Sequence, residues 1–223
     1  MIAVLALLLQ VPSAGGVIDQ GTFVIRADTQ EVGRETFRVL ERRVGDSTSG
    51  WLFDANARWT GTGKPTVFAP VIEIDGDSMT HALSFNVSGG PAPLRISGQP
   101  SRNRLTLRSV SPGVERAREL PTDRTFVVID DSVFTPWLLV AWRARPVTDS
   151  LTVVFPRTAL RTRIAIRDLG AESTTLNRDQ TTLRHVLITG SPQGPVHLWL
   201  GSGGRLMKVE VPDRNLTAER LPS

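Results

Sequence analysis

The chain lacks cysteine and tyrosine altogether and carries only three histidines in 223 residues. Without cysteine there is no disulfide framework, and no lipobox cysteine that could be acylated. Lysine is nearly absent too, since Lys64 and Lys208 are the only two. Because arginine is the main base and neither cysteine nor tyrosine titrates at alkaline pH, the pI is about 10.8 although the net charge is only +4.

The arginines do not form a polybasic cluster in the sequence. They are spread singly over positions that we expect to face outward on strands, as Arg161, Arg163 and Arg167 do. Nucleic-acid binding needs clustered basic residues, with stacking aromatic rings between them for single strands. We therefore expect no nucleic-acid partner.

A long apolar run occurs at the N-terminus. Met1–Val11 is uncharged and apolar, and Pro12 and the small residues 13–16 follow it. This pattern predicts a secretory signal peptide over residues 1–16, although the run lacks a preceding Lys or Arg; the alternative is a buried N-terminal strand. A membrane span needs about 20 apolar residues, so no transmembrane anchor is expected. Residues 17–223 are then one exported domain, periplasmic or extracellular and monomeric, of a size that all-β domains reach.

Period-two alternation dominates the rest of the chain. Val196–Val211 reads as a hairpin in which Val196, Leu198 and Leu200 share one face, and in which Met207 and the valines after it do the same on the return arm. Trp51–Trp59 alternates most clearly. Further strands are expected at 22–28, 33–41, 66–74, 78–87, 94–98, 105–110, 114–120, 126–129, 151–155, 160–167, 172–176, 183–189 and 216–221.

One segment predicts a helix. Thr135 suits the N-cap and Pro136 the first helical residue, and an apolar run follows and ends before Pro146. Asp130 and Asp131 are interpreted as acids that stabilise the start of this helix, with a catalytic carboxylate pair as the alternative. A lone apolar helix must pack on a sheet. We expect a mostly β fold, a curved antiparallel sheet or half-open barrel with the helix in or on its concave face; the alternative is a β-sandwich.

Four segments carry a resemblance to a known family: Gly21–Gly33, Val128–Leu139, Leu151–Pro156 and Val196–Pro212. They resemble an uncharacterised family of exported bacterial β-domains, whose members occur alone or ahead of α/β-hydrolase domains. That family is similar in expected fold to the half-barrel, Lol-type lipoprotein carriers of the bacterial periplasm. The resemblance implies a half-barrel fold, and it supplies no agreed catalytic residues that could be carried over to this chain.

No catalytic motif is found. Thr60–Thr66 lacks the first glycine of a phosphate-binding loop, and Pro65 prevents a helix from following. Gly201–Gly204 precedes a strand, so it is a hairpin loop and not a nucleophile elbow. His81, His185 and His197 are too far apart for a local metal motif, and alternation predicts that His81 shares one strand face with Leu83 and Phe85. We expect no enzyme activity, no metal and no cofactor.

The five tryptophans and eight phenylalanines indicate where a ligand would bind, if the sheet leaves a cavity. The same side chains could instead fill the core. The candidate ligand-binding residues are Trp51, Phe53, Trp59, His81, Phe85, Trp137, Leu138 and Trp199.

Two non-enzymatic functions remain open from the sequence, and a hydrolase remains a third alternative only if scattered Ser, His and Asp side chains converge in a cleft. The first is an exported, non-enzymatic carrier that shields an apolar or lipid-like ligand while rim arginines bind its acidic head group. The second is a structural or interaction domain that docks with an envelope protein or a hydrolase. A continuous apolar cavity would favour the carrier, and a filled core with an exposed patch or edge strand would favour docking.

Overall fold

The computed structural model describes residues 13–44, 47–60, 64–76, 80–90, 92–123, 125–144 and 150–222. Nearly all regular structure is β, as the alternation predicts. The strands are β1 Ser13–Ala27, β2 Gln30–Val44, β3 Ser47–Trp59, β4 Thr66–Asp75, β5 Thr80–Gly89, β6 Leu94–Ser101, β7 Arg104–Ser111, β8 Val114–Pro121, β9 Val127–Val128, β10 Ser150–Phe155, β11 Leu160–Leu176, β12 Asp179–Thr189, β13 Val196–Leu200, β14 Leu206–Val211 and β15 Leu216–Arg220. The α-helix is α1 Trp137–Arg143, and short 3-10 turns occupy Ser202–Gly204 and Pro212–Arg214.

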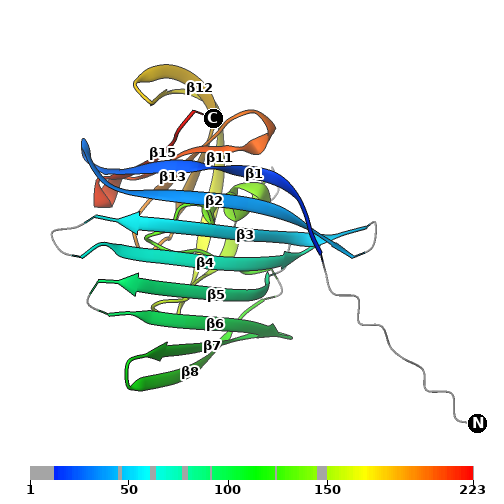
Figure 1. Ribbon diagram of the computed structural model, residues 1–223. Helices are drawn as coiled ribbons and strands as arrows, with labels where there is room; N and C mark the ends of the chain where they lie inside the picture. Colours follow the sequence, from blue (N-terminus) through cyan, green and yellow to red (C-terminus); the bar gives the residue numbers. More distant parts are fainter. Residues whose placement is uncertain are drawn as a thin grey trace, which may run out of the picture.

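All of these strands belong to one curved sheet that does not close into a barrel (Figure 1). Its order is β8-β7-β6-β5-β4-β3-β2-β1-β15-β14-β13-β12-β11-β10-β9, so strands consecutive in sequence are adjacent in the sheet, except that β8 and β9 lie at its two ends. The first and last strands, β1 and β15, pair with each other. Every pairing is antiparallel except the short parallel contact between β9 and β10. The expected curved sheet with one short helix is confirmed.

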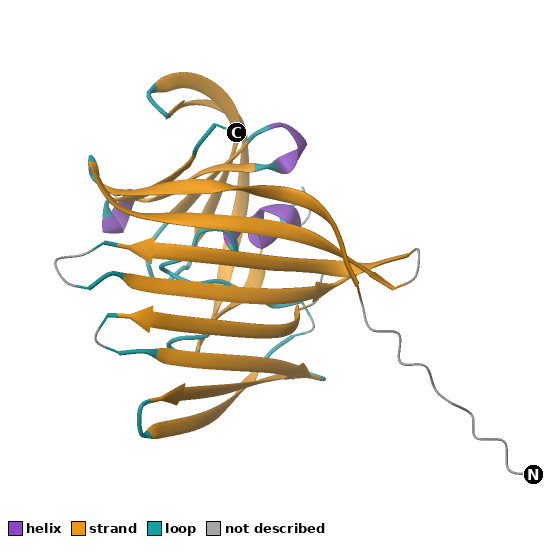
Figure 2. Cartoon of the chain, in the orientation of Figure 1, coloured by secondary structure: helices purple, strands orange, loops and turns teal. Residues whose placement is uncertain are grey.

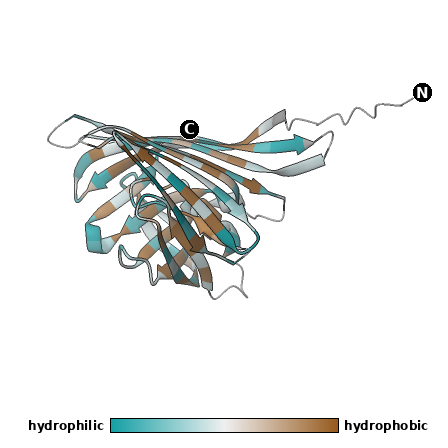
Figure 3. Ribbon diagram, turned by 90° about the horizontal axis from the view of Figure 1, so that it is seen from below, coloured by the Kyte–Doolittle hydropathy of each residue, from teal (hydrophilic) through white to brown (hydrophobic). Residues whose placement is uncertain are grey.

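The concave face of the sheet is filled by α1 and the residues before it (Figure 2). Trp142 of α1 packs edge-on against Trp51 and Phe53 of β3, with ring centroids 6.0 and 5.3 Å apart. Trp137 and Leu138 are 1% and 2% exposed. Brown and teal alternate along many strands in Figure 3, which reflects one core-facing and one solvent-facing side.

The helix begins differently from the expectation. Thr135 does not cap it, because its hydroxyl and its backbone N–H both donate to the carboxylate of Glu35, and Pro136 takes the N-cap position. Asp130 does not cap it either, since its carboxylate accepts hydrogen bonds from Ser132 N and from Arg157. The capping interpretation was therefore wrong, and both acidic side chains of the pair 130–131 bind Arg157 instead.

β-bulges account for the other differences, because one extra residue reverses the alternation of a strand. His81 sits at the register shift between Glu73 and Ile74 of the partner strand, and its side chain is 56% exposed, so it does not share the core face of Leu83 and Phe85. Met207 is displaced in the same way in β14, where Leu206 takes the core position. A shift near Gly170 joins the two strands expected at 160–167 and 172–176 into one, β11.

The predicted signal peptide falls mostly outside the described residues, which begin at Ser13. β1 starts there, and its pairing with β2 includes Ser13 with Arg43 and Ala14 with Arg42. Within the described ranges, no helix has the length and apolar character needed to span a membrane.

Candidate functional site

The aromatic residues expected to bind a ligand lie mainly in the packed core. Phe53, Phe85, Trp137 and Leu138 are each at most 2% exposed. Trp51 and Trp59 are partly exposed and pack against the core, where Trp59 stacks on Phe134 at 6.4 Å and donates a hydrogen bond to the backbone oxygen of Ser132. None of these six residues lines either of the two pockets described below.

The remaining two candidates lie elsewhere. His81 lines a small depression with Asp75, and its Nδ1 is 3.6 Å from a carboxylate oxygen of that residue. Trp199 lies on the opposite face of β13 from the core residues Leu198 and Leu200. The structure therefore does not bring the eight candidates together into one site.

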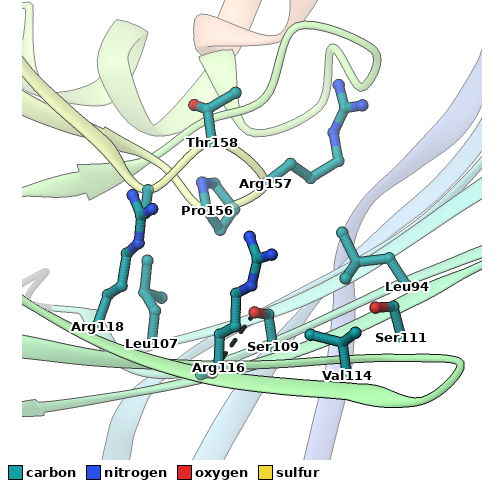
Figure 4. Close-up of a pocket in the computed structure, with 11 residues that line it drawn as sticks. Leu94, Leu107, Ser109, Ser111, Val114, Arg116, Arg118, Pro156, Arg157 and Thr158 are labelled. Atoms are coloured by element: carbon teal, nitrogen blue, oxygen red, sulfur yellow. Dashed lines mark hydrogen bonds between the residues drawn. The ribbon is translucent and has the colours of Figure 1, made fainter.

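A groove opens where the curved sheet fails to close. Its floor is the concave side of β6, β7 and β8, and its opposite wall is the turn between β10 and β11 (Figure 4). Its volume is about 410 Å³. We call it the arginine groove; it is lined by Leu94, Leu107, Ser109, Ser111, Val114, Arg116, Arg118, Pro156, Arg157, Thr158 and Ala159.

Arg116 and Arg118 face into this groove because they occupy alternate positions of β8, opposite Ser109 and Leu107 of β7. Figure 4 shows both side chains extending from β8 toward the turn that carries Pro156 and Thr158. Neither guanidinium forms an ion pair with any residue that the structure describes. The groove therefore holds two uncompensated positive charges roughly 7 Å apart along the strand.

The other side of β8 is electrically balanced. Glu115 accepts a hydrogen bond from Arg108, and Glu119 accepts one from Arg104 at 2.6 Å. The charged residues of β8 thus sort by face, with paired acids on the convex side and unpaired arginines on the concave side. Sequence reasoning missed this arrangement because it treated the arginines as outward-facing.

Arg157 forms part of the wall of the groove but is already paired. Its Nε lies 2.7 Å from Asp130 Oδ2, and its Nη2 donates to Asp131 and to the hydroxyl of Ser132. Burial raises the pKa of Asp130, while the charge of Arg157 and its hydrogen bonds oppose that rise. We infer that Arg157 fixes the β10–β11 turn and that Arg116 and Arg118 are the cations available to a ligand.

A second pocket of about 510 Å³ adjoins the groove, because Arg157 and Thr158 line both. Phe155, Leu160 and Pro192 give it apolar walls. Arg214 stands at its polar side and donates to the backbone oxygen of Asp131 at 2.6 Å. The two pockets together offer a cationic region next to a more apolar one.

Glu35 is a buried carboxylate that the sequence analysis did not single out. It is 0% exposed and accepts hydrogen bonds from the backbone N–H groups of Phe134 and Thr135, at 2.6 and 2.7 Å. Burial raises its pKa to about 7, with a smaller contribution from Asp130 and opposition from these hydrogen bonds. Its place on the core face of β2, two residues before Phe37, was the signal that could have identified it.

A polar cluster lies on the outer face of the C-terminal strands. His185 Nε2 is 2.8 Å from His197 Nδ1, and His185 Nδ1 is 2.7 Å from Glu172. His185 also stacks on Trp199 at 4.0 Å. Histidines that are distant in sequence thus meet across β12 and β13, yet the described residues hold no group of three or more side chains arranged to bind a metal.

The lining of the arginine groove suits the binding of an anion. It combines guanidinium groups, two serine hydroxyls and apolar surface, and none of its lining residues is a histidine, aspartate or glutamate. Guanidinium groups bind carboxylate and phosphate oxygens through directed N–H donors. The geometry therefore suits an anion that also carries an apolar part.

Comparison with known proteins supports the fold. No protein-family model matches the chain, and no curated protein matches its sequence. The crystal structure of a β-barrel-like protein of a domain of unknown function, DUF1849, from Brucella abortus is similar, with a TM-score of 0.56. The match covers 91% of this chain and 94% of that chain at 10% sequence identity, so the likeness concerns the fold alone.

Proposed function

We propose that this protein is a non-enzymatic binding protein that holds an amphipathic anion, such as an acyl chain with an acidic head group. The observation that carries the proposal is the pair Arg116 and Arg118, whose guanidinium groups face the groove without an acidic partner among the described residues. An anion placed between them would receive directed N–H donors from both side chains. The hydroxyl of Ser111 also lines the groove as a further donor, whereas that of Ser109 donates to the backbone oxygen of Arg116 at 3.5 Å.

Apolar surface next to these cations would take the tail of the ligand. Leu94, Leu107 and Val114 line the groove itself, and the adjoining pocket adds Phe155 and Leu160. Removing a methylene group from water contributes about 0.8 kcal/mol, so a chain of several carbons would add substantially to the affinity. The buried aromatic residues of β3 and α1 then serve to hold the sheet in its curved shape.

Export is a further part of the proposal. The apolar run Met1–Val11 supports a signal peptide that is removed near Gly16, which leaves a monomeric domain in the periplasm or outside the cell. The resemblance to half-barrel lipoprotein carriers supports an acyl ligand, and the resemblance to domains found ahead of α/β-hydrolases supports an envelope partner. Sequencing the N-terminus of the secreted protein tests this part, with Val17 as the expected first residue.

The binding proposal is tested by native mass spectrometry of the protein purified without detergent, followed by titration with a fluorescent fatty acid. We expect a bound ligand mass that is lost on organic extraction, and saturable binding by the extracted protein. Replacing both groove arginines, Arg116→Gln with Arg118→Gln, should weaken binding by roughly tenfold or more.

Arg95→Gln is the matched control. Arg95 is exposed and lies on the convex side of β6, since it alternates with the core residue Ile96. It should leave the affinity unchanged. Equal affinity for the fatty acid in the wild type and in the double groove variant would refute the proposed site.

A further inference from the structure

The strand β8 forms an open end of the sheet. All of its eight residues, from Val114 to Pro121, pair with β7, and no described strand pairs with its other edge. Seven of the eight residues are exposed, and they include residues from both faces of the strand. The opposite end of the sheet is different, because β9 has only two residues and both are buried.

The backbone groups at this edge can be assigned from the hairpin geometry. Ser111 and Val114 pair across the two-residue turn at 112–113, so they form the hydrogen-bonded pair that closes the hairpin. Hydrogen-bonded and non-hydrogen-bonded pairs alternate along an antiparallel ladder. The N–H and C=O groups of Glu115, Ala117 and Glu119 are therefore the ones directed away from β7, toward the open edge.

An added strand would meet a different environment on each face. On the concave side it would lie beside Arg116 and Arg118, which have no acidic partner in the described chain. On the convex side it would lie beside Glu115 and Glu119, which Arg108 and Arg104 already neutralise. Cross-strand neighbours of opposite charge stabilise a pairing, and like charges oppose it. A strand with acidic side chains on its concave face satisfies this pattern.

A second copy of β8 does not satisfy this charge pattern. When two β8 strands pair antiparallel about a two-fold axis, concave residues lie opposite concave residues. In the registers that pair the middle of one β8 with the middle of the other, Arg116 lies opposite Arg118 of the second copy, or one of these arginines lies opposite the same arginine of the second copy. The same charges that oppose self-association at this edge would select an acidic partner.

We propose that β8 binds an extended acidic segment of another polypeptide as an additional antiparallel strand, with acidic residues at alternate positions facing Arg116 and Arg118. This inference goes beyond the binding of a small amphipathic anion, because backbone hydrogen bonds to residues 115, 117 and 119 would provide part of the affinity.

The test uses a fluorescent peptide of alternating Glu and Val, measured by fluorescence anisotropy with the full-length protein. We expect saturable binding, at least roughly tenfold tighter than that of the matching Lys–Val peptide. Hydrogen–deuterium exchange should show protection of β8 when the peptide is bound. Absence of binding, or equal binding of the two peptides, would overturn the proposal.

Variants that cannot form the backbone hydrogen bonds distinguish strand addition from simple charge attraction. A Glu–Val peptide that is N-methylated at alternate residues, on the edge that faces β8, keeps its charges and should bind at least tenfold more weakly. Ala117→Pro removes an edge N–H from the protein and should have the same effect, with Ala117→Val as control. If the N-methylated peptide binds as well as its parent, strand addition is ruled out.

The two proposals fail in different ways. Ala117→Pro should lose the peptide and retain the fatty acid, whereas the double variant Arg116→Gln with Arg118→Gln should weaken both. Fatty-acid binding without peptide binding would overturn the edge-strand proposal alone, and peptide binding without fatty-acid binding would overturn the groove proposal alone.

Discussion

At the scale of single residues, the buried carboxylate of Glu35 both titrates at an unusual pH and holds the backbone at the start of the helix. Its carboxylate accepts hydrogen bonds from the backbone of residues 134 and 135, directly before α1. Burial raises its pKa from 4.5 to about 7. The folded protein thus binds a proton at Glu35 in a pH range where the unfolded chain has already released it.

This difference gives a stability that decreases with pH. The contribution of Glu35 is fully present below pH 4.5, and it is lost as the pH rises through about 7, because the folded state alone must then bury a charge. The shift corresponds to roughly 3 kcal/mol, as an order of magnitude. We expect urea denaturation at pH 5 and pH 8 to give a smaller pH difference for Glu35→Gln than for the wild type. An identical difference in both proteins would contradict this account.

At the scale of elements, the long hairpin of β11 and β12 curls over the outer face of the C-terminal strands. Lys208 of β14 is 6% exposed beneath it, and its Nζ donates to the backbone oxygen of Thr175 at 2.8 Å. Asn177 at the tip donates to the backbone oxygen of Arg220 at 2.9 Å. These few bonds hold the end of the hairpin against the sheet.

Replacing this lysine should therefore loosen the hairpin selectively. Lys208→Met keeps most of the apolar stem and removes the charged hydrogen bond to Thr175, which contributes about 1.5–3 kcal/mol, together with the ion pair between Lys208 and Glu210 at 2.7 Å. We expect amide exchange in residues 172–183 to become roughly tenfold faster or more, with β2 and β3 little changed. Lys64→Met, at an exposed loop position, is the matched control. Unchanged exchange in the hairpin would mean that other contacts hold it.

Individual elements also show what the sequence could and could not predict. Alternation located β3, β4 and β13 because each has a clear apolar face. It failed at His81 and Met207, where a bulge shifts the phase without a distinctive residue type. It also could not place Arg116 and Arg118, because alternation groups residues on a face without saying which face is concave.

At the scale of the whole molecule, the sheet curves around a packed core and leaves its open space at the rim. Aromatic residues were expected either to fill a core or to line a cavity, and these alternatives have the same local sequence pattern. Only the contact of Trp142 with β3, and the burial of Trp137 and Leu138, distinguish them. Such contacts join segments about ninety positions apart along the chain, so no local pattern reveals them.

Core and groove should therefore respond independently to mutation. Trp137→Ala removes a side chain that is 1% exposed, and large-to-small changes of this kind cost about 3–5 kcal/mol. We expect urea denaturation to show that loss, while the affinity of the folded variant for a fatty acid stays within about twofold of the wild type. The double variant Arg116→Gln with Arg118→Gln should show the reverse, with weakened binding and little change in stability, because both side chains are exposed. A large loss of affinity in folded Trp137→Ala would instead place the ligand among the aromatic residues of the concave face.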